Sequence, residues 1–109
     1  SLTLDTLQLK RIGSGNSNDI SNIQLFNNGI SISDFKNLDQ NDNVFFGNLN
    51  YNLETGLNKI CVLADLSFSA TTLNQEGFAI IDYSNISTTP TIKAGGSFPS
   101  YGPLMTISE

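Results

Sequence analysis

The chain has 109 residues, of which 39% are hydrophobic and only 14% charged, and its formal net charge is -5. This length predicts one domain, residues 1–109, around a single core. The five Lys and Arg residues are dispersed, so they form no basic surface for nucleic acid or an anionic membrane, and no run approaches the roughly 18 apolar residues of a membrane-spanning helix. Asn, Ser and Thr replace the missing charge, so we expect an extracellular or cell-surface location.

Short runs that alternate apolar and polar residues recur along the chain, and no segment has the apolar spacing of a helix. The first run, residues 2–10, changes its apolar phase at Asp5 and Thr6, which predicts a β-bulge or a strand that passes between two sheets. The next run, residues 19–26, leads to Asn28-Gly29, a pair that tolerates positive φ and therefore predicts a tight hairpin.

The second half of the chain continues the same pattern. A strand is expected within residues 44–53, after a polar, turn-rich segment. Residues 58–70 carry apolar side chains on both faces, which predicts a central strand. Further strands are expected at residues 77–86, 90–93 and 103–108. About seven or eight strands in this length predict an all-β fold, an immunoglobulin-like antiparallel β-sandwich, although Trp and a Cys pair are absent.

Groups that carry out catalysis are scarce. Histidine is absent, which removes Ser-His-Asp and Cys-His nucleophilic machinery and most zinc and copper sites. The acidic residues fall mostly at predicted turns and strand ends, which does not favour the facing carboxylates of a glycosidase. Cys61, the only cysteine, is interpreted as a small buried hydrophobe rather than a reactive thiol. We therefore expect no enzymatic activity.

Calcium is the one cofactor that the residues suggest, because it prefers oxygen ligands from carboxylates and amides. The segment DQNDN, residues 39–43, matches the start of an EF-hand loop, but Val44 and Asn50 stand where that loop needs Gly and a bidentate Glu. The ligands of a different kind of calcium site would be Asp39, Asn41 and Asp42, joined by Asp19. The alternative is a solvated turn whose side chains bond to their own backbone.

Aromatic residues raise the question of a carbohydrate site, because exposed aromatic rings stack on sugars. The aromatic candidates are Tyr51, Tyr83, Phe98 and Tyr101, of which Tyr51, Phe98 and Tyr101 are the predicted ligand residues; Phe98 and Tyr101 lie within GGSFPSYGP. The alternative is packing in the core or a loop, which the absence of Trp favours. A glycan is therefore expected as a partner only if these rings are exposed.

The segment GSGNSND, residues 13–19, has the two glycines that a loop needs to cradle an anion. It lacks the Lys of a phosphate-binding loop, however, and it precedes a predicted strand rather than a helix. We interpret it as a connection between two strands, in which the Asp19 side chain holds the loop through hydrogen bonds to the backbone.

Two longer stretches, LTLDTLQLKRIGSGNSNDISNIQLFNNG and VFFGNLNYNLETGLNKICVLADLSFSA, carry these motifs in order. The set resembles immunoglobulin-like β-sandwich repeat modules of bacterial and archaeal secreted and cell-surface proteins. The matching positions are Gly13, Gly15, Asn16, Asp19, Ile20, Leu25 and Gly29, then Gly56, Ala64, Asp65 and Leu66. The resemblance covers residues 2 to about 86 and implies a non-catalytic structural module of a stalk, sheath or adhesin-like chain, while residues 89–109 lie outside it.

These features predict a non-catalytic extracellular module, a building block of a surface filament, stalk or layer that assembles through complementary strands and edges. Its partners would be copies of itself or neighbouring domains. A terminal strand, residues 1–10 or 103–108, would complete a neighbour's sheet. Two alternatives remain, a carbohydrate-binding or adhesion module of a larger secreted protein and a passive spacer.

Overall fold

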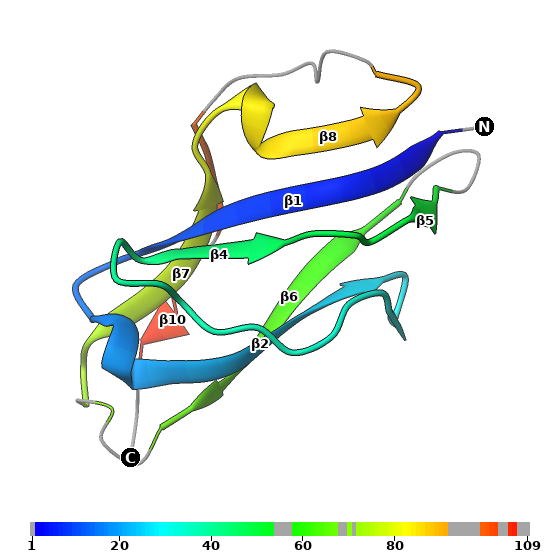
Figure 1. The fold of residues 1–109 in the computed structure, drawn as a ribbon. Helices are drawn as coiled ribbons and strands as arrows, with labels where there is room; N and C mark the ends of the chain where they lie inside the picture. Colours follow the sequence, from blue (N-terminus) through cyan, green and yellow to red (C-terminus); the bar gives the residue numbers. More distant parts are fainter. Residues whose placement is uncertain are drawn as a thin grey trace.

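The computed structural model describes residues 2–53, 58–67, 70, 72–91, 99–102 and 105–106. Within these residues the chain is all-β, with two antiparallel sheets packed face to face (Figure 1). The predicted antiparallel β-sandwich is therefore confirmed. This part of the chain contains ten strands rather than seven or eight, because four of them are only two residues long and leave little trace in the sequence pattern.

The larger sheet is built around the first strand. Its members are β1 (Thr3–Ile12), β4 (Asn43–Phe46), β5 (Tyr51–Asn52), β7 (Gln75–Ile80), β8 (Ile86–Thr89), β9 (Ser100–Tyr101) and β10 (Met105–Thr106). Strands β4 and β5 pair with one side of β1, β7 and β8 pair with the other, and β9 and β10 pair with β7. The register between β1 and β8 shifts between Leu4 and Thr6 of β1, which confirms the bulge predicted from the change of apolar phase.

The smaller sheet has the order β3 (Ile30–Ser31), β2 (Ile20–Asn27), β6 (Ile60–Leu66). The hairpin between β2 and β3 turns at Asn28 and Gly29, with φ angles of 51° and 85°, as predicted. Strand β6 pairs with β2 alone among the residues that the structure describes, so it is an edge strand. The prediction that this segment is a central strand is wrong.

Asparagine residues occupy most of the tight backbone bends in the described part of the chain. Of the six non-glycine residues with positive φ in the described part, four are Asn and one is Asp. One of them, Asn22, lies where the β2–β6 register shifts, and its side chain donates to Asp65 at 3.0 Å. Asn and Asp enter this backbone region more readily than other side chains. The abundance of Asn therefore reflects tight bends as well as a polar surface.

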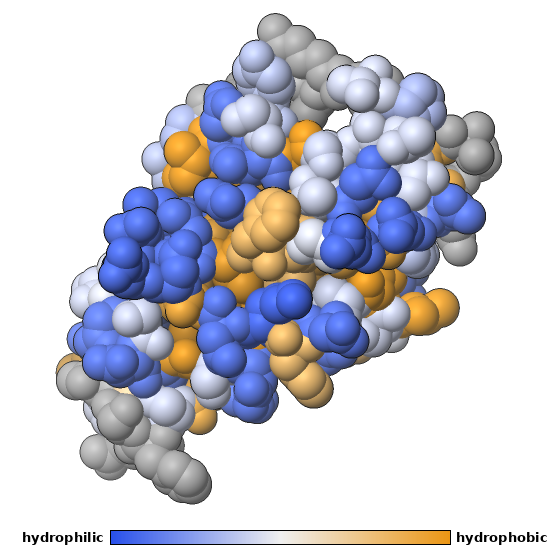
Figure 2. Space-filling model, viewed as in Figure 1, coloured by the Kyte–Doolittle hydropathy of each residue, from blue (hydrophilic) through white to orange (hydrophobic). Residues whose placement is uncertain are grey.

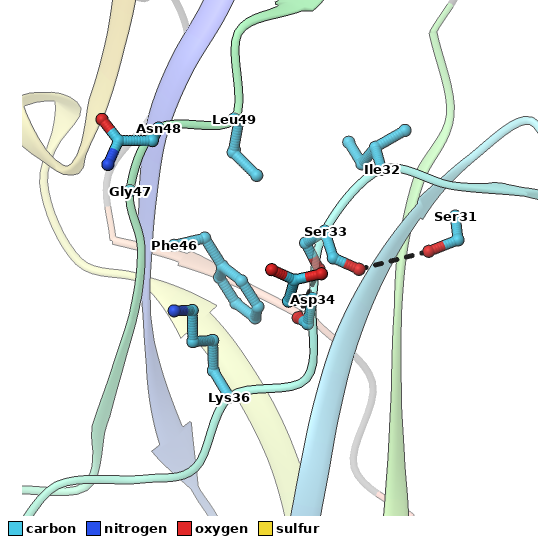
Figure 3. A pocket seen from close by; sticks show the side chains of 9 residues that line it. All are labelled: Ser31, Ile32, Ser33, Asp34, Lys36, Phe46, Gly47, Asn48 and Leu49. Carbon is cyan, nitrogen blue, oxygen red and sulfur yellow. Dashed lines mark hydrogen bonds between the residues drawn. The ribbon is translucent and has the colours of Figure 1, made fainter.

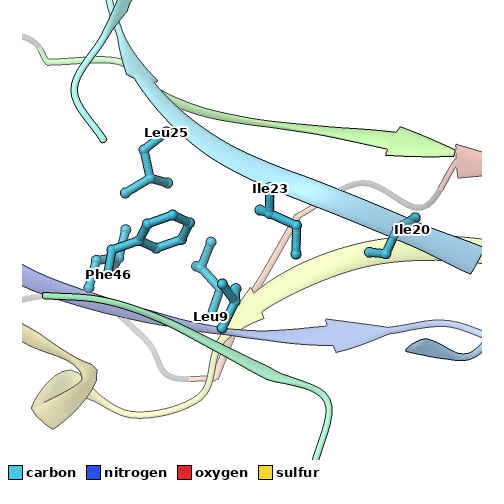
Figure 4. Close-up of a cluster of buried hydrophobic side chains, with 7 residues drawn as sticks. Leu9, Ile20, Ile23, Leu25 and Phe46 are labelled. Atoms are coloured by element: carbon cyan, nitrogen blue, oxygen red, sulfur yellow. The ribbon is translucent and has the colours of Figure 1, made fainter. Parts of the chain in front are cut away.

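The core lies between the two sheets. Figure 4 shows Ile20, Ile23 and Leu25 of β2 pointing toward Leu9 of β1 and Phe46 of β4. Ile23, Leu25 and Phe46 are fully buried. These side chains come from strands far apart in sequence, so the core forms only when the two sheets meet.

The loop of residues 13–19 ends in a short 3-10 turn, η1 (Ser17–Asp19). The Asn16 side chain accepts from the backbone N–H of Asn18 at 2.9 Å, and Oδ2 of Asp19 accepts from the backbone N–H of Asn16 at 3.0 Å. This reciprocal capping closes the turn just before β2 begins. The interpretation of GSGNSND as a strand connection held by Asp19 is confirmed. A second capped turn, η2 (Tyr83–Asn85), leads into β8 in the same way.

Candidate functional site

One edge of strand β6 is not paired with another strand among the described residues. Lys59 bonds to Asn28 through its backbone N–H and C=O, and the Ser67 N–H donates to the Asp19 carbonyl. Because successive residues of a strand point their backbone groups to opposite sides, odd-numbered residues face β2. The residues whose N–H and C=O groups face the other side are Ile60, Val62, Ala64 and Leu66.

The side chains of these even-numbered residues lie on the inner face of the smaller sheet. Ile60 and Val62 are half-buried and pack against the core cluster. Ala64 and Leu66 continue the same face, yet both are exposed, and 57% of Leu66 is accessible to solvent. An inner-face leucine left uncovered means that the sandwich is open at this end of β6.

A groove of about 980 Å³ lies along β6 between the two sheets, and we call it the β6 groove. Its opposite wall comes from the larger sheet, chiefly Leu4, Leu7, Phe78, Ile80 and Ile86. Lys59 and Glu76 are the only charged residues in its described lining. The smaller sheet, of three strands, does not cover the whole inner face of the larger sheet, of seven strands. Apolar surface of both sheets is therefore left facing this opening.

A buried charge network stands at one end of the groove. Arg11 is 7% exposed, and its guanidinium donates to Glu76 Oε1 at 3.0 Å and to Asp42 Oδ2 at 2.9 Å. Glu76, which also lines the groove, is 6% exposed. Burial raises the pKa of Glu76 to about 7, helped by a hydrogen bond with the Asp19 carboxyl and opposed by Arg11. Neither Arg11 nor Glu76 was predicted from the sequence as a site residue.

A second hollow, of about 500 Å³, lies between residues 31–36 and the end of β4. Figure 3 shows Phe46, Leu49 and Ile32 directed into it, with Asn48 directed away. Ser31 donates to the Ser33 carbonyl at 3.2 Å, so this hydroxyl holds the loop itself in place. Phe46 has no exposed surface, so the apolar surface that the hollow offers a ligand comes chiefly from the half-buried Ile32 and Leu49.

The predicted calcium ligands form an Asx turn. Oδ1 of Asp39 accepts from the backbone N–H groups of Asn41 at 2.8 Å and Asn43 at 3.0 Å, and Asp42 binds Arg11. Asp19 lies in η1 and is connected to Asp42 through Glu76 and Arg11. Among the described residues, no group of three or more acidic, Cys or His side chains is placed to hold a metal ion. Calcium binding by these residues stays a prediction.

Replacing Asp39 with alanine should lower the free energy of unfolding by about 1 kcal/mol, because two backbone amides of the turn lose their acceptor. Urea denaturation measures this change, and Asp34→Ala, at an exposed position in the preceding loop, is the control. If calcium binds here, millimolar calcium will raise the melting temperature of the wild type but not of Asp39→Ala. Equal stability of the two variants and the wild type would contradict the structural role of Asp39.

The predicted aromatic residues do not form one platform. Tyr51 is half-buried, accepts a hydrogen bond from Asn27 at 2.8 Å and pairs with Leu4. Tyr101, 66% exposed, pairs with Ala79, which is opposite Lys10. The two positions are therefore six residues apart along β1, roughly 20 Å along the strand. Phe98 lies outside the described residues. A single sugar ring would therefore meet only one of the two described aromatic rings.

Two further observations complete the site. Cys61 is half-buried and lines the β6 groove, so it is less enclosed than expected. In the part of the chain that the structure describes, no helix is long and apolar enough to cross a membrane.

Comparisons with protein-family models, with curated proteins and with solved structures find no match to this chain. The resemblance to secreted β-sandwich repeat modules therefore stays a prediction.

Proposed function

We propose that this chain is a non-catalytic structural module that assembles with copies of itself by accepting an added β-strand along the β6 groove. The observation that carries the proposal is the combination of an unpartnered strand edge with uncovered inner-face side chains, Ala64 and Leu66, above an apolar groove. An incoming strand gains main-chain hydrogen bonds from the edge and places alternate side chains in the groove.

The first strand is not available as the donor. β1 pairs with four other strands and contributes Leu4, Leu7 and Leu9 to the buried interior. Removing residues 1–10 would take away the centre of the larger sheet. The expectation that these residues form a detachable terminal strand is therefore dropped, and their deletion should unfold the chain rather than leave a folded remnant.

The C-terminal segment, residues 103–108, is the better donor. Within its described part, β10 is held by two residue pairs only, and Met105 is 70% exposed on the rim of the groove. Residues 94–108 contain no charged side chain. An uncharged strand enters an apolar groove without the cost of desolvating a charge, and it adds nothing to the repulsion between chains of net charge -5.

The proposal places the assembly outside the cell, as a filament, stalk or layer. The low share of charged residues and the abundance of Asn, Ser and Thr support this location. The face in Figure 2 is mostly hydrophilic, with hydrophobic side chains scattered among polar ones. Scattered hydrophobic side chains of this kind are normal on a hydrated surface.

Replacing Ala64 with proline tests the role of the edge. The proline removes an N–H that faces away from β2, so the ladder between β2 and β6 keeps its hydrogen bonds. Light scattering with size exclusion, over a concentration series, should show growing species for the wild type and a constant mass near 11.8 kDa for Ala64→Pro. Ala64→Ser, which keeps the N–H, should behave as the wild type. A wild type that stays at 11.8 kDa throughout would contradict the proposal.

A further inference from the structure

Two buried carboxyl groups meet beneath the loop of residues 13–19. Asp19 is 1% exposed and Glu76 is 6% exposed. A β-carbon at Gly15 would lie 1.7 Å from Glu76 Oε2 and 2.5 Å from Asp19 Oδ2, so both oxygens lie against the same point of the loop. Two carboxylates packed together away from water cannot both ionise without a large cost.

The hydrogen bonding around the pair agrees with a shared proton. Glu76 Oε2 is buried and accepts from no N–H or hydroxyl donor. The group beside it is the Asp19 carboxyl, with which Glu76 forms a hydrogen bond. Two carboxyl groups form such a bond only when one of them carries a proton. That proton satisfies the otherwise unpaired oxygen.

The Arg11 guanidinium faces the pair and is shared with a third carboxyl group. Arg11 of β1 contacts Glu76 Oε1, and Asp42, from the turn before β4, binds the same guanidinium. The Asp19 carboxyl accepts from the Asn16 N–H at 3.0 Å and from the Asn74 amide at 3.4 Å. Arg11 is shared between Glu76 and Asp42, so loss of the shared proton adds a negative charge to a buried site whose guanidinium already has another carboxylate partner.

The pair holds together three segments of the chain. The Gly15 N–H donates to the Gln75 carbonyl at 3.1 Å, and the Gln75 N–H donates to Ser14 Oγ at 2.9 Å. Gln75 and Glu76 also pair with Thr106 and Met105 of β10. The loop, the start of β7 and the β10 strand thus meet beside the carboxyl pair.

We infer that the Asp19–Glu76 pair is a proton-dependent latch, which closes the loop of residues 13–19 onto β7 and releases β10 when both carboxyls ionise. As a control on assembly this rests on the proposed function, because β10 belongs to the proposed donor. The opening of the loop itself does not depend on that proposal.

The direction of the pH effect follows from the closed and open forms. In the closed form the pKa of Glu76 is raised from 4.5 to about 7, and opening returns the carboxyl to water. The closed form is therefore favoured fully below about pH 4.5 and loses that advantage as the pH rises to about 7. The equilibrium constant for opening should rise about tenfold per pH unit across this window.

Amide hydrogen exchange, corrected for its intrinsic pH dependence, tests the latch at the Gly15 and Gln75 amides. Their protection in the wild type should fall about tenfold per pH unit up to about pH 7. Glu76→Gln should show no such fall, because its amide does not ionise and donates to Asp19. Asp34→Asn, at an exposed carboxyl, should follow the wild type. Constant protection in the wild type, or the same fall in Glu76→Gln, would overturn the inference.

A carboxyl NMR titration of the wild type gives an independent reading without a variant. A midpoint for Glu76 near 7 supports the latch, and one near 4.5 overturns it. Light scattering at pH 5 and pH 8 then separates the two proposals. Greater assembly at pH 8 supports both. If exchange depends on pH but no assembly occurs at pH 5 or pH 8, the proposed function is rejected and the latch is kept. If assembly occurs but exchange does not change with pH, the latch is rejected and the proposed function is kept.

Discussion

Replacing Arg11 with alanine should lower the free energy of unfolding by about 4 kcal/mol, one of the two largest effects expected for a single change in this chain. The guanidinium is 7% exposed and contacts both Glu76 and Asp42, so its loss leaves one buried and one half-buried carboxyl group without this counter-charge. Urea denaturation measures the change. Lys10→Ala, at the adjacent exposed position of β1, should shift stability by no more than about 0.5 kcal/mol.

The same variant distinguishes lost charge from lost packing. Combined with Glu76→Gln, Arg11→Ala should cost clearly less than it does alone, because one of the two stranded carboxylates is gone. If the two changes simply add, or if Arg11→Ala costs under about 1 kcal/mol, the network does not stabilise the fold as described.

Replacing Phe46 with alanine should cost about 4 kcal/mol, because the ring is fully buried between the sheets and its removal leaves a cavity. Its neighbour Phe45 lies on the opposite face of β4 and is 55% exposed, so Phe45→Ala should cost less than about 1 kcal/mol. Urea denaturation of this adjacent pair compares the same chemical change on the two faces of one strand. Equal losses would mean that the core does not lie where Figure 4 places it.

Local signals in the sequence predicted the features that depend on neighbouring residues. The phase change at Asp5 and Thr6 appears as the register shift in β1, and Asn28-Gly29 forms the hairpin. Asp19 holds its loop as interpreted, because capping involves residues only three apart. Bulges, turns and caps are settled within a few residues, so they can be recognised without knowledge of the fold.

The candidate site depends on contacts between residues far apart in the sequence, which no local pattern predicts. Apolar residues on both faces of 58–70 indicated a buried central strand, but Leu63 and Leu66 are exposed beside the groove. Periodicity does not separate a covered apolar side chain from one that awaits a partner. Arg11 continues the inward alternation of Leu7 and Leu9, which was a usable signal for a buried charge. Its partner Glu76 is 65 positions away in the sequence, so the contact between the two residues could be recognised only from the folded structure.

Hydrogen exchange by NMR on the chain mixed with a synthetic peptide of residues 102–108 tests the β6 groove most directly. Strand addition predicts protection of the even-numbered β6 amides, from Ile60 to Leu66, with little change at the odd-numbered amides that already face β2. Even-numbered amides that exchange equally fast with and without the peptide, or protection confined to another strand, would contradict strand addition at β6.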